Sequence, residues 1–476
     1  MKTIKYFFIG ALMTVVSAPV MAQNTLDDAI KVVKSNASVK EKEAALKEAK
    51  FNKKNAADAV KVGNAFLSAG DTLNTRKYAE MAKKADKKFG DAYILLGDLE
   101  AHNDNPGAAA GWYEQAIYFD PNNESGYTRY AAINSYSSPR IAVETLEKLR
   151  TIRPDYPVDA DAGHIYYNVF MNKGGDDNKK SSVEHYKKVN KDKLSINQLT
   201  EFALISFLDN DFETSAGAAQ YGASKEPRNA GFNRLLMYNY TDLKQYDKAV
   251  TYIDKLFNQS DSAKFTRNDY MYAGLALEGA EKYADALVYY KKQLDESKTD
   301  AELSRALRSI SDCNASMKNY SEAIEYFKKY MDKKGEITIN DENSYAGLHQ
   351  RLANTLEGDA KTNALQKAAD IYVGMTSKYA DNADFCYYKA AQANAMLDPT
   401  SEKGLAKPYY EKLASLVEGH GINSNADKAR AIEAYSYLGY YNYKANQQAV
   451  AKSYYQKLLQ VDPENAGAKQ VLEVLK

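Results

Sequence analysis

Few side chains in this sequence are spaced so that they could act together as acids, bases, nucleophiles or metal ligands. The five histidines have no metal-ligand spacing among themselves; they are His102, His164, His185, His349 and His420. The chain contains no G-x-S-x-G, Walker, G-x-G-x-x-G or H-E-x-x-H motif. We interpret the histidines as isolated surface or loop residues and predict no catalytic residue, no cofactor and no metal site.

The two cysteines give no sign of redox chemistry. Cys313 and Cys386 are far apart in the sequence, and both lie within apolar helical patterns. No Cys-x-x-Cys pair exists. An exported protein could form a disulfide from them. The sequence around them nevertheless favours two buried free thiols.

The charge balance argues against one class of partner. The chain has 63 basic and 63 acidic residues and no formal net charge. Proteins that bind nucleic acids usually carry a basic surplus, so no nucleic-acid partner is predicted. The segment 31–90 is locally basic, and we interpret it as a solvated helix face rather than as a surface for anionic glycans or lipids.

The first 22 residues resemble a secretory signal peptide. Lys2 and Lys5 precede a short apolar run, and small or modest residues precede a cleavage point after Ala22. A buried N-terminal helix is the alternative. The next residue is Gln23 and not the cysteine that a bacterial lipoprotein would need. We therefore expect an exported protein of the periplasm or cell surface, with no transmembrane anchor in the mature chain.

One spacing of residues recurs along the chain. A small residue is followed after four positions by an aromatic or apolar residue, and after three more by an apolar one. Ala109, Tyr113 and Ala116 show it, as do Ala451, Tyr455 and Leu458. The small residue returns at Ala142, Ser182, Ser215, Ala249, Ala286, Ala323, Ala368 and Ala406, at intervals mostly of 33 to 45 residues. Periods of this size mark stacked helical hairpins, each too small to bury its own faces.

The residue types and offsets of this pattern resemble the tetratricopeptide repeat. An upstream half precedes each small residue, for example Leu96-Gly97 before Ala109 and Gly274 before Ala286. The resemblance covers roughly residues 56–464, in about eleven copies. It implies an all-α fold, a right-handed superhelical solenoid of helix–turn–helix repeats. We divide the chain into the signal peptide 1–22, a helical segment 23–55, the repeats 56–464, and a C-terminal capping helix 465–476.

The pattern also predicts how the two helices of a repeat meet. Gly or Ala on the first helix is expected to face Ala on the second, with the axes about 8–9 Å apart. Pro121 and Pro463 cannot continue the preceding helices. Each is expected to open the helix that follows.

The resemblance implies a binding surface as well. In tetratricopeptide proteins the first helix of each repeat lines a concave groove. Its exposed positions correspond here to Arg234, Tyr238, Met271, Arg305, Arg308, Asp312, Tyr388, Gln392, Tyr440 and Tyr443. Tyr and Arg often anchor interfaces. Some family members hold a peptide carboxylate with a clamp of basic residues and Asn, but Tyr238 and Tyr272 stand where the Asn would be. We therefore predict no recognition of a terminal carboxylate.

Two functions remain open at this point. The first is a non-enzymatic scaffold of the cell envelope that binds a protein or an extended peptide in the groove. The alternative is a glycan-binding protein that uses exposed tyrosines on the same helices. The fold cannot decide between them, because function depends on the site.

Overall fold

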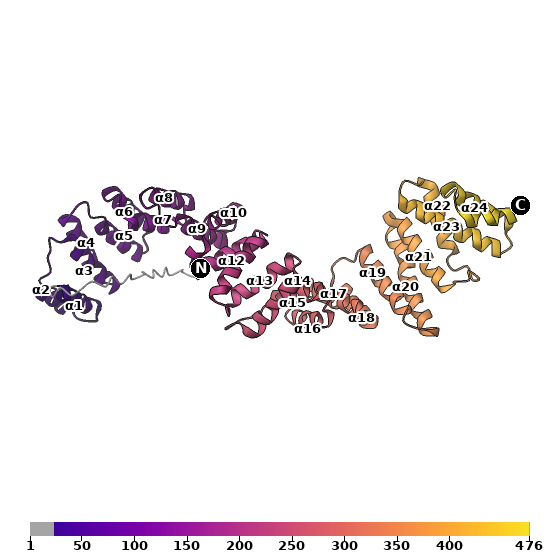
Figure 1. Cartoon of the computed structure of the whole chain (residues 1–476), viewed down its shortest axis with the longest axis horizontal. Helices are drawn as coiled ribbons and strands as arrows, with labels where there is room; N and C mark the ends of the chain where they lie inside the picture. Colours follow the sequence, from indigo (N-terminus) through magenta and orange to yellow (C-terminus); the bar gives the residue numbers. More distant parts are fainter. Residues whose placement is uncertain (1–22, 476) are drawn as a thin grey trace. The chain divides into compact units, whose positions relative to one another are not determined.

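The chain folds into helices alone over the part that the structure describes. A computed structural model describes residues 23–475, which form 25 α-helices and no strand (Figure 1). The all-α prediction is confirmed. The proposed signal peptide, residues 1–22, lies outside the described residues. No helix within 23–475 combines the length and the apolar character needed to cross a membrane.

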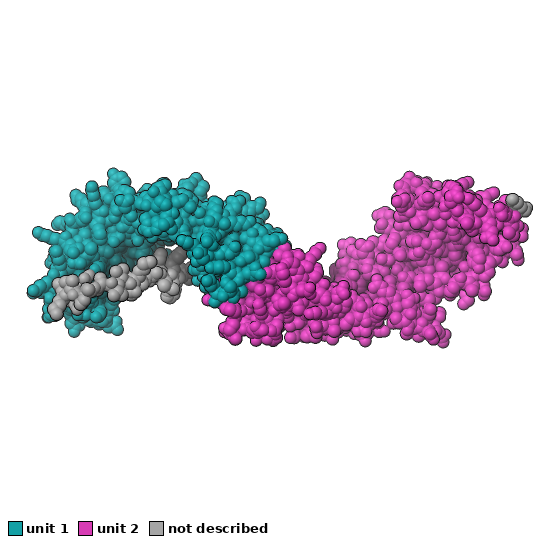
Figure 2. Space-filling model, in the orientation of Figure 1, with its two compact units in different colours: residues 1–225 teal, residues 226–476 magenta. Residues whose placement is uncertain are grey.

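The chain divides into two compact units, residues 1–225 and 226–476 (Figure 2). In the first unit, α1 (Gln23–Lys34) and α2 (Val39–Glu48) precede five helical hairpins. These pair α3 (Ala56–Ser68) with α4 (Thr72–Ala85), α5 (Gly90–His102) with α6 (Pro106–Phe119), α7 (Glu124–Asn134) with α8 (Pro139–Ile152), α9 (Val158–Lys173) with α10 (Asp176–Lys187), and α11 (Ile196–Leu208) with α12 (Phe212–Lys225). A short 3-10 helix, Lys191–Lys193, links the last two hairpins.

The second unit contains six hairpins and a final helix. Its hairpins pair α13 (Ala230–Asp242) with α14 (Tyr246–Asp254), α15 (Arg267–Gly279) with α16 (Tyr283–Asp295), α17 (Asp300–Ser316) with α18 (Tyr320–Lys333), α19 (Ile339–Ala353) with α20 (Gly358–Lys378), α21 (Ala383–Leu397) with α22 (Lys407–His420), and α23 (Asn425–Lys444) with α24 (Gln448–Val461). Helix α25 (Ala466–Val474) packs on α24. A π-helical turn, Lys255–Gln259, ends α14, and a 3-10 turn, Ala380–Asn382, precedes α21.

The small residue of each copy is buried where the two helices of a hairpin meet. All ten such positions, from Ala109 to Ala451, are fully inaccessible to solvent. The predicted partner of the first-helix glycine was wrong, however. A Cβ added to Gly97 would lie 2.3 Å from the Tyr113 ring, and one added to Gly274 would lie 2.4 Å from the Tyr290 ring. Glycine is needed because an aromatic ring, and not an alanine, lies directly against the first helix.

The tyrosines of these hairpins also have a polar role. The Tyr113 hydroxyl donates to Asp98 at 2.7 Å, and the Tyr290 hydroxyl donates to Glu278 at 2.5 Å. Burial, together with the neighbouring carboxylate, raises the pKa of both tyrosines well above its ordinary value. Both hydroxyls therefore stay protonated at neutral pH and act as donors.

The prediction that Pro121 and Pro463 open the following helices was wrong. Pro121 lies in the turn between α6 and α7, and Asn123 is the N-cap of α7, where its side chain accepts from the Gly126 N–H. Asn465 caps α25 in the same way, two residues after Pro463. Asn is preferred at this position because its side-chain oxygen satisfies an N–H that has no partner inside the helix. The proline ends one helix, and the asparagine starts the next.

The two cysteines are free and buried, as predicted. Burial raises the pKa of Cys313 to about 12 and that of Cys386 to about 11. Neither thiol is ionised at neutral pH, so both behave as small apolar side chains in the hairpin cores.

Candidate partner-binding surface

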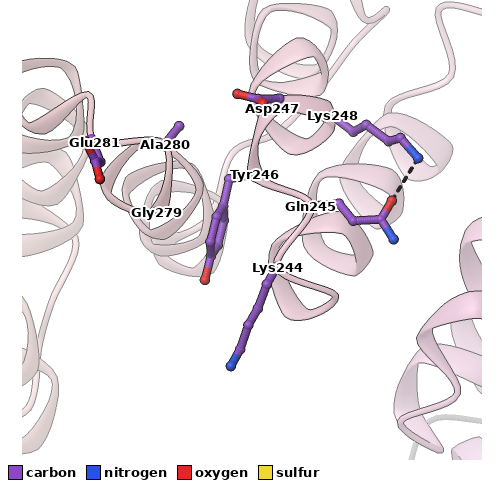
Figure 3. Close-up of a pocket in the computed structure, with 8 residues that line it drawn as sticks. All are labelled: Lys244, Gln245, Tyr246, Asp247, Lys248, Gly279, Ala280 and Glu281. Carbon is purple, nitrogen blue, oxygen red and sulfur yellow. Dashed lines mark hydrogen bonds between the residues drawn. The ribbon is translucent and has the colours of Figure 1, made fainter.

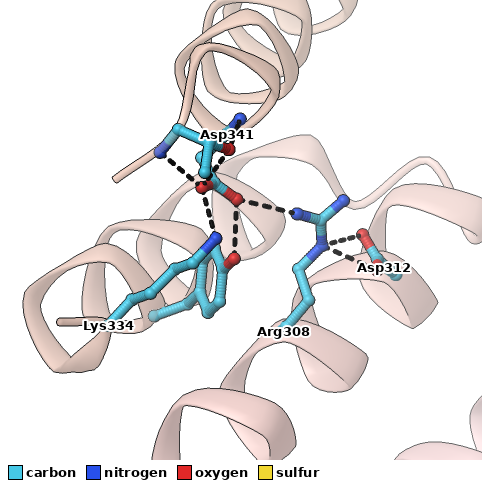
Figure 4. Close-up of polar contacts among 6 residues, drawn as sticks. Arg308, Asp312, Lys334 and Asp341 are labelled. Atoms are coloured by element: carbon cyan, nitrogen blue, oxygen red, sulfur yellow. Dashed lines mark hydrogen bonds and ion pairs between the residues drawn. The ribbon is translucent and has the colours of Figure 1, made fainter. Parts of the chain in front are cut away.

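Arg308 on α17 is held by contacts on several sides. Its Nε lies 2.8 Å and 3.0 Å from the two carboxylate oxygens of Asp312, one turn along the helix. Its guanidinium carbon lies 4.6 Å from the centre of the Phe327 ring. Its Nη1 lies 3.8 Å from Asp341 Oδ1 (Figure 4). The Arg308 side chain remains one-third exposed. These contacts fix its direction while leaving one edge open to solvent.

Asp341, in the first turn of α19, is hydrogen-bonded from several directions. It accepts hydrogen bonds from Tyr330 at 2.6 Å, from Lys334 at 2.5 Å, and from both the backbone and the hydroxyl of Thr338 (Figure 4). Burial opposes the ionisation of Asp341, but the hydrogen bonds from Lys334, Tyr330 and Thr338 outweigh it and hold the pKa of Asp341 well below its ordinary range. The carboxylate is therefore charged and ties α18 to the start of α19.

A cavity of about 460 Å³ opens beside these residues. It is lined from α17, α18, α19, α20 and α21, and its lining includes Arg308, Asp312, Arg351, Lys389 and several uncharged polar side chains. The lining thus holds three basic side chains and one acidic one. Among residues 23–475, neither Arg351 nor Lys389 has an ion-pair partner. We call this cavity and its lining residues the α17–α21 surface; it has an excess of positive charge available to a partner.

The uncharged part of this surface can make directional hydrogen bonds. Asn343, Gln350 and Asn354 line the cavity with both donor and acceptor atoms. Burial raises the pKa of Tyr372 to about 12, so its hydroxyl stays protonated, and it donates to the Asn343 side chain at 3.3 Å. Met396 and Phe327 add apolar area. A polar chain with an acidic group fits this mixture of side chains.

Two other predicted groove residues are joined to the next hairpin. The Tyr388 hydroxyl donates to Glu433 on α23 at 2.8 Å, and the Gln392 amide donates to the same carboxylate at 3.2 Å. Tyr410 also donates to Glu433, at 2.6 Å. Burial, followed by the bond to Glu433, raises the pKa of Tyr388 to about 12. These contacts hold α21 against α23 and leave Tyr388 and Gln392 partly exposed.

The expectation that Tyr238 is exposed was wrong. Only 7% of Tyr238 is accessible, and its hydroxyl donates to the buried Asp269 at 2.8 Å. Arg234 binds the same carboxylate, with its Nε 2.6 Å from Oδ1. The Tyr238 ring stacks on Tyr272 with 3.9 Å between the ring centres. A buried carboxylate needs hydrogen-bond donors or an opposite charge. Arg234 and Tyr238 supply these to Asp269, so both side chains are turned toward the next hairpin and not toward a ligand.

The remaining predicted residues are more accessible. Arg305 on α17 is exposed, and Met271 on α15 is half-buried. Tyr440 and Tyr443, one turn apart on α23, are 45% and 40% exposed. The structure therefore brings only Arg308 and Asp312 of the ten predicted residues into the cavity. Sequence reasoning missed Arg351 and Lys389, which lie on first helices but outside the positions used to select candidates.

The histidines were not as isolated as predicted. His164 lies 2.8 Å from Glu201, His185 lies 2.8 Å from Asp159, and His420 lies 2.7 Å from Asp384. Asp427 also lies near His420, and the three side chains offer ligand atoms within 4.8 Å of one another. The sequence could not indicate these pairs, because each joins residues of different helices.

A second cavity lies at the turns of two neighbouring hairpins. It has a volume of about 430 Å³ and is lined by residues 244–248 and 279–281. The Tyr246 ring lies directly against Gly279, where a Cβ would be 2.4 Å from the ring (Figure 3). The Tyr246 side chain therefore packs the turn between α13 and α14 against the C-terminal end of α15.

Solved structures that are similar to this chain include two tetratricopeptide repeat proteins and a type IV pilus biogenesis factor. The C-terminal part of a TPR repeat-containing protein from Cytophaga hutchinsonii is 23% identical, with a TM-score of 0.45, over 57% of this chain and 98% of that one. A tetratricopeptide repeat protein from Parabacteroides merdae is 16% identical, with a TM-score of 0.32, over 54% of this chain and 98% of that one. PilW, a type IV pilus biogenesis factor, is 14% identical, with a TM-score of 0.31, over 46% of this chain and 98% of that one.

No protein-family model matches the chain, and the search of curated proteins found no match.

Proposed function

We propose that this chain is a non-enzymatic interaction scaffold that binds a protein or an extended peptide at the α17–α21 surface. The observation that carries the proposal is the pair of basic side chains, Arg351 and Lys389, that line a polar cavity without an ion-pair partner among the described residues. Charged side chains that face opposite charges across an interface steer the encounter and set specificity. An acidic or polar segment is the best match.

Hydrogen bonds join the helices that carry this surface to their neighbours. Asp341 holds α18 to α19, and Glu433 holds α21 to α23 through Tyr388, Gln392 and Tyr410. A surface that is already ordered loses less conformational entropy when a partner binds. These hydrogen bonds, one buried and four part-buried, therefore favour binding even though they do not touch the partner.

The proposal that the scaffold is not an enzyme rests on its cysteines and histidines. Both thiols have raised pKa values and are buried, so neither supplies a thiolate nucleophile. Of the three acid-paired histidines, none lines the cavity of the α17–α21 surface.

A glycan is the second candidate ligand. Tyr440 and Tyr443 are both well exposed and lie three residues apart on α23, so their rings share one face of the helix. Exposed aromatic rings can stack on sugar rings, and this pair is separate from the cavity. Replacing both tyrosines by alanine would abolish capture of a glycan but would leave capture of a peptide by the α17–α21 surface intact.

The cell-envelope location rests on residues 1–22 alone. If the signal peptide is removed after Ala22, the mature scaffold begins at Gln23 and works outside the cytoplasm.

The test is affinity capture with the mature protein from an envelope extract of its natural host. The wild-type protein should retain a partner that a variant with Arg351→Ala and Lys389→Ala retains poorly. Arg140→Ala is the matched control, because Arg140 forms only an exposed ion pair with Glu144 on α8. Equal capture by both variants would show that the partner binds elsewhere.

A further inference from the structure

Three potential metal ligands from three helices meet near the C-terminal part of the second unit. Asp384 lies in the first turn of α21, His420 is the last residue of α22, and Asp427 lies in the first turn of α23. Their ligand atoms lie within 4.8 Å of one another. The Asp384 and Asp427 side chains are 21% and 13% exposed, and that of His420 is 40% exposed. The group is therefore held by the fold and still open to solvent on one side.

The imidazole of His420 is oriented for ligation. Its Nδ1 lies 2.7 Å from the Gly421 carbonyl oxygen. A carbonyl oxygen can only accept, so Nδ1 must carry a proton and donate it. The other nitrogen, Nε2, then points at Asp384 Oδ2, 2.7 Å away. Metal-bound histidines commonly donate their second ring N–H to a backbone carbonyl in this way, which fixes the ring and its tautomer.

The loop between α22 and α23 is ordered around the same atoms. The Asn423 backbone N–H donates to Asp427 Oδ2 at 3.2 Å, and its side-chain amide donates to the His420 carbonyl oxygen at 2.8 Å. The loop thus holds His420 and Asp427 on the same side. These bonds come from the backbone and side chain of Asn423, and they orient two of the three residues, His420 and Asp427.

We propose that Asp384, His420 and Asp427 form a binding site for a divalent transition-metal ion, with Zn²⁺ as the best match. The ligand set is one imidazole nitrogen and two carboxylates, which Zn²⁺ accepts, and a water molecule from the open side completes four-coordination. Without metal, a proton lies between Nε2 and Asp384. The ion replaces that proton, which is released to solvent, and binds the Nε2 lone pair and one oxygen of each carboxylate.

Arg430 lies beside the same carboxylates and would weaken the site. One of its guanidinium nitrogens, Nη1, is 3.8 Å from Asp384 and 3.6 Å from Asp427. Its positive charge repels a divalent cation and competes for the carboxylate oxygens. The proposal therefore predicts that Arg430→Gln binds the metal more tightly than the wild type. If these residues form only an ion-pair cluster, neither the wild type nor Arg430→Gln should bind the metal.

A bound ion would act as a clip within this part of the second unit. It would join the start of α21, the end of α22 and the start of α23, next to the Glu433 contacts that hold Tyr388. Metal binding to a folded site raises stability because the unfolded chain lacks the assembled ligands. The C-terminal hairpins would then unfold at a higher temperature when the ion is present.

The test is titration of the metal-free chain with Zn²⁺, followed by calorimetry and by thermal unfolding. The wild type should bind one ion and show a raised unfolding midpoint, whereas Ca²⁺ should have no such effect because it prefers more oxygen ligands. His420→Gln should weaken the affinity more than about tenfold, since even loss of a hydrogen-bond partner of a ligand typically costs about 10–100-fold. His102→Gln, at the exposed end of α5, is the matched control and should bind like the wild type.

Visible absorption of added Co²⁺ gives a readout that does not depend on stability. The wild type and Arg430→Gln should both show the bands of four-coordinate Co²⁺, and His420→Gln should not. The proposal is overturned if the wild type binds no ion, if His420→Gln binds as tightly as the wild type, or if Arg430→Gln binds more weakly than the wild type.

Discussion

The Tyr290 ring and Gly274 illustrate how single residues fix the distance between two helices. The ring fills the space in which a Cβ on Gly274 would lie, and the hydroxyl is held by Glu278. The same arrangement joins Gly97 with Tyr113, whose hydroxyl donates to Asp98. The glycine, the ring and the carboxylate act together, so a change to any one of them affects the others.

Gly274→Ala should destabilise the protein. The new methyl group would lie 2.4 Å from the Tyr290 ring, which is fully buried and cannot move aside cheaply. Overpacking of this kind typically costs about 1–3 kcal/mol in free energy of unfolding. Denaturant unfolding measures the change.

Gly374→Ala on α20 is the matched control for this substitution. Apart from its chain neighbours and the backbone of its own helix, no atom lies within 4 Å of its added Cβ, so the substitution should leave stability unchanged or raise it by up to about 1 kcal/mol. Equal effects of the two substitutions would contradict the packing account.

Asp341 gives a prediction about how the free energy of unfolding changes at acidic pH. Its folded-state pKa is lowered: burial opposes the shift, but the bonds from Lys334, Tyr330 and Thr338 outweigh it. A carboxyl group in the unfolded chain has a pKa of about 3.9. The stability due to Asp341 is therefore fully present above about pH 5 and is lost as the pH falls below about 4 toward the folded pKa. Asp341→Asn should cost about 2–4 kcal/mol at neutral pH.

Unfolding of wild type and Asp341→Asn across the acid range measures this difference. The difference in free energy of unfolding between the two proteins should narrow as the pH falls below about 5. Asp300→Asn is the control, since Asp300 pairs with Lys333 on an exposed surface and should contribute less than about 1 kcal/mol. A gap that stays constant with pH would show that Asp341 acts through shape and not through charge.

At the scale of helices, the repeat spacing predicted the hairpins because it is a local signal. Small and aromatic residues recur at fixed offsets, and each offset places them on one face of a helix. Eleven hairpins between Ala56 and Val461 agree with the predicted number of copies. The proline-to-helix assignment failed because the capping asparagine two residues later, as at Asn123, was not considered.

The candidate site was predicted less well, and for a physical reason. Arg234 bonds with Asp269, and Tyr388 bonds with Glu433, across 35 and 45 residues. A repeat pattern shows that a position lies on the inner side of a helix. It does not show whether the next hairpin supplies an acid that pulls the side chain away from solvent. Arg308 is one of the selected residues that line the cavity, whereas Arg351 lines it too but falls outside the selected positions.

Helix α25 provides a prediction about how repeats support each other. Its Ala468 is buried, and Val471, Leu472 and Leu475 pack against the cluster that contains Leu438, Leu458 and Tyr455. Deletion of residues 465–476 should therefore expose that cluster and speed hydrogen exchange in 432–463. Because repeats contact mainly their neighbours, exchange in 91–123 should not change. Unaltered exchange in 432–463 would show that α25 is not a cap.

At the scale of the whole molecule, each compact unit contains its own set of hairpins and its own core. The α17–α21 surface and the Asp384, His420 and Asp427 group both belong to the second unit. We therefore expect the partner and the metal to be features of residues 226–476. The first unit carries the locally basic segment 31–90, which is the next surface to test.

The proposed export concerns the whole chain and is tested on protein from its natural host. N-terminal sequencing should begin at or near Gln23, because the charged start and short apolar run are typical of a cleaved signal peptide. Retention of Met1 in protein found in the cytoplasm would contradict the proposed location.

The central claim is that the α17–α21 surface binds the partner, and the dissociation constant of the captured partner tests it most directly. The variant with Arg351→Ala and Lys389→Ala should bind about thirtyfold more weakly or worse, since truncating interface anchors typically costs about 2 kcal/mol or more. Its thermal midpoint should stay near that of the wild type, because neither side chain forms an ion pair within residues 23–475. An unchanged dissociation constant in a folded double variant would contradict the account.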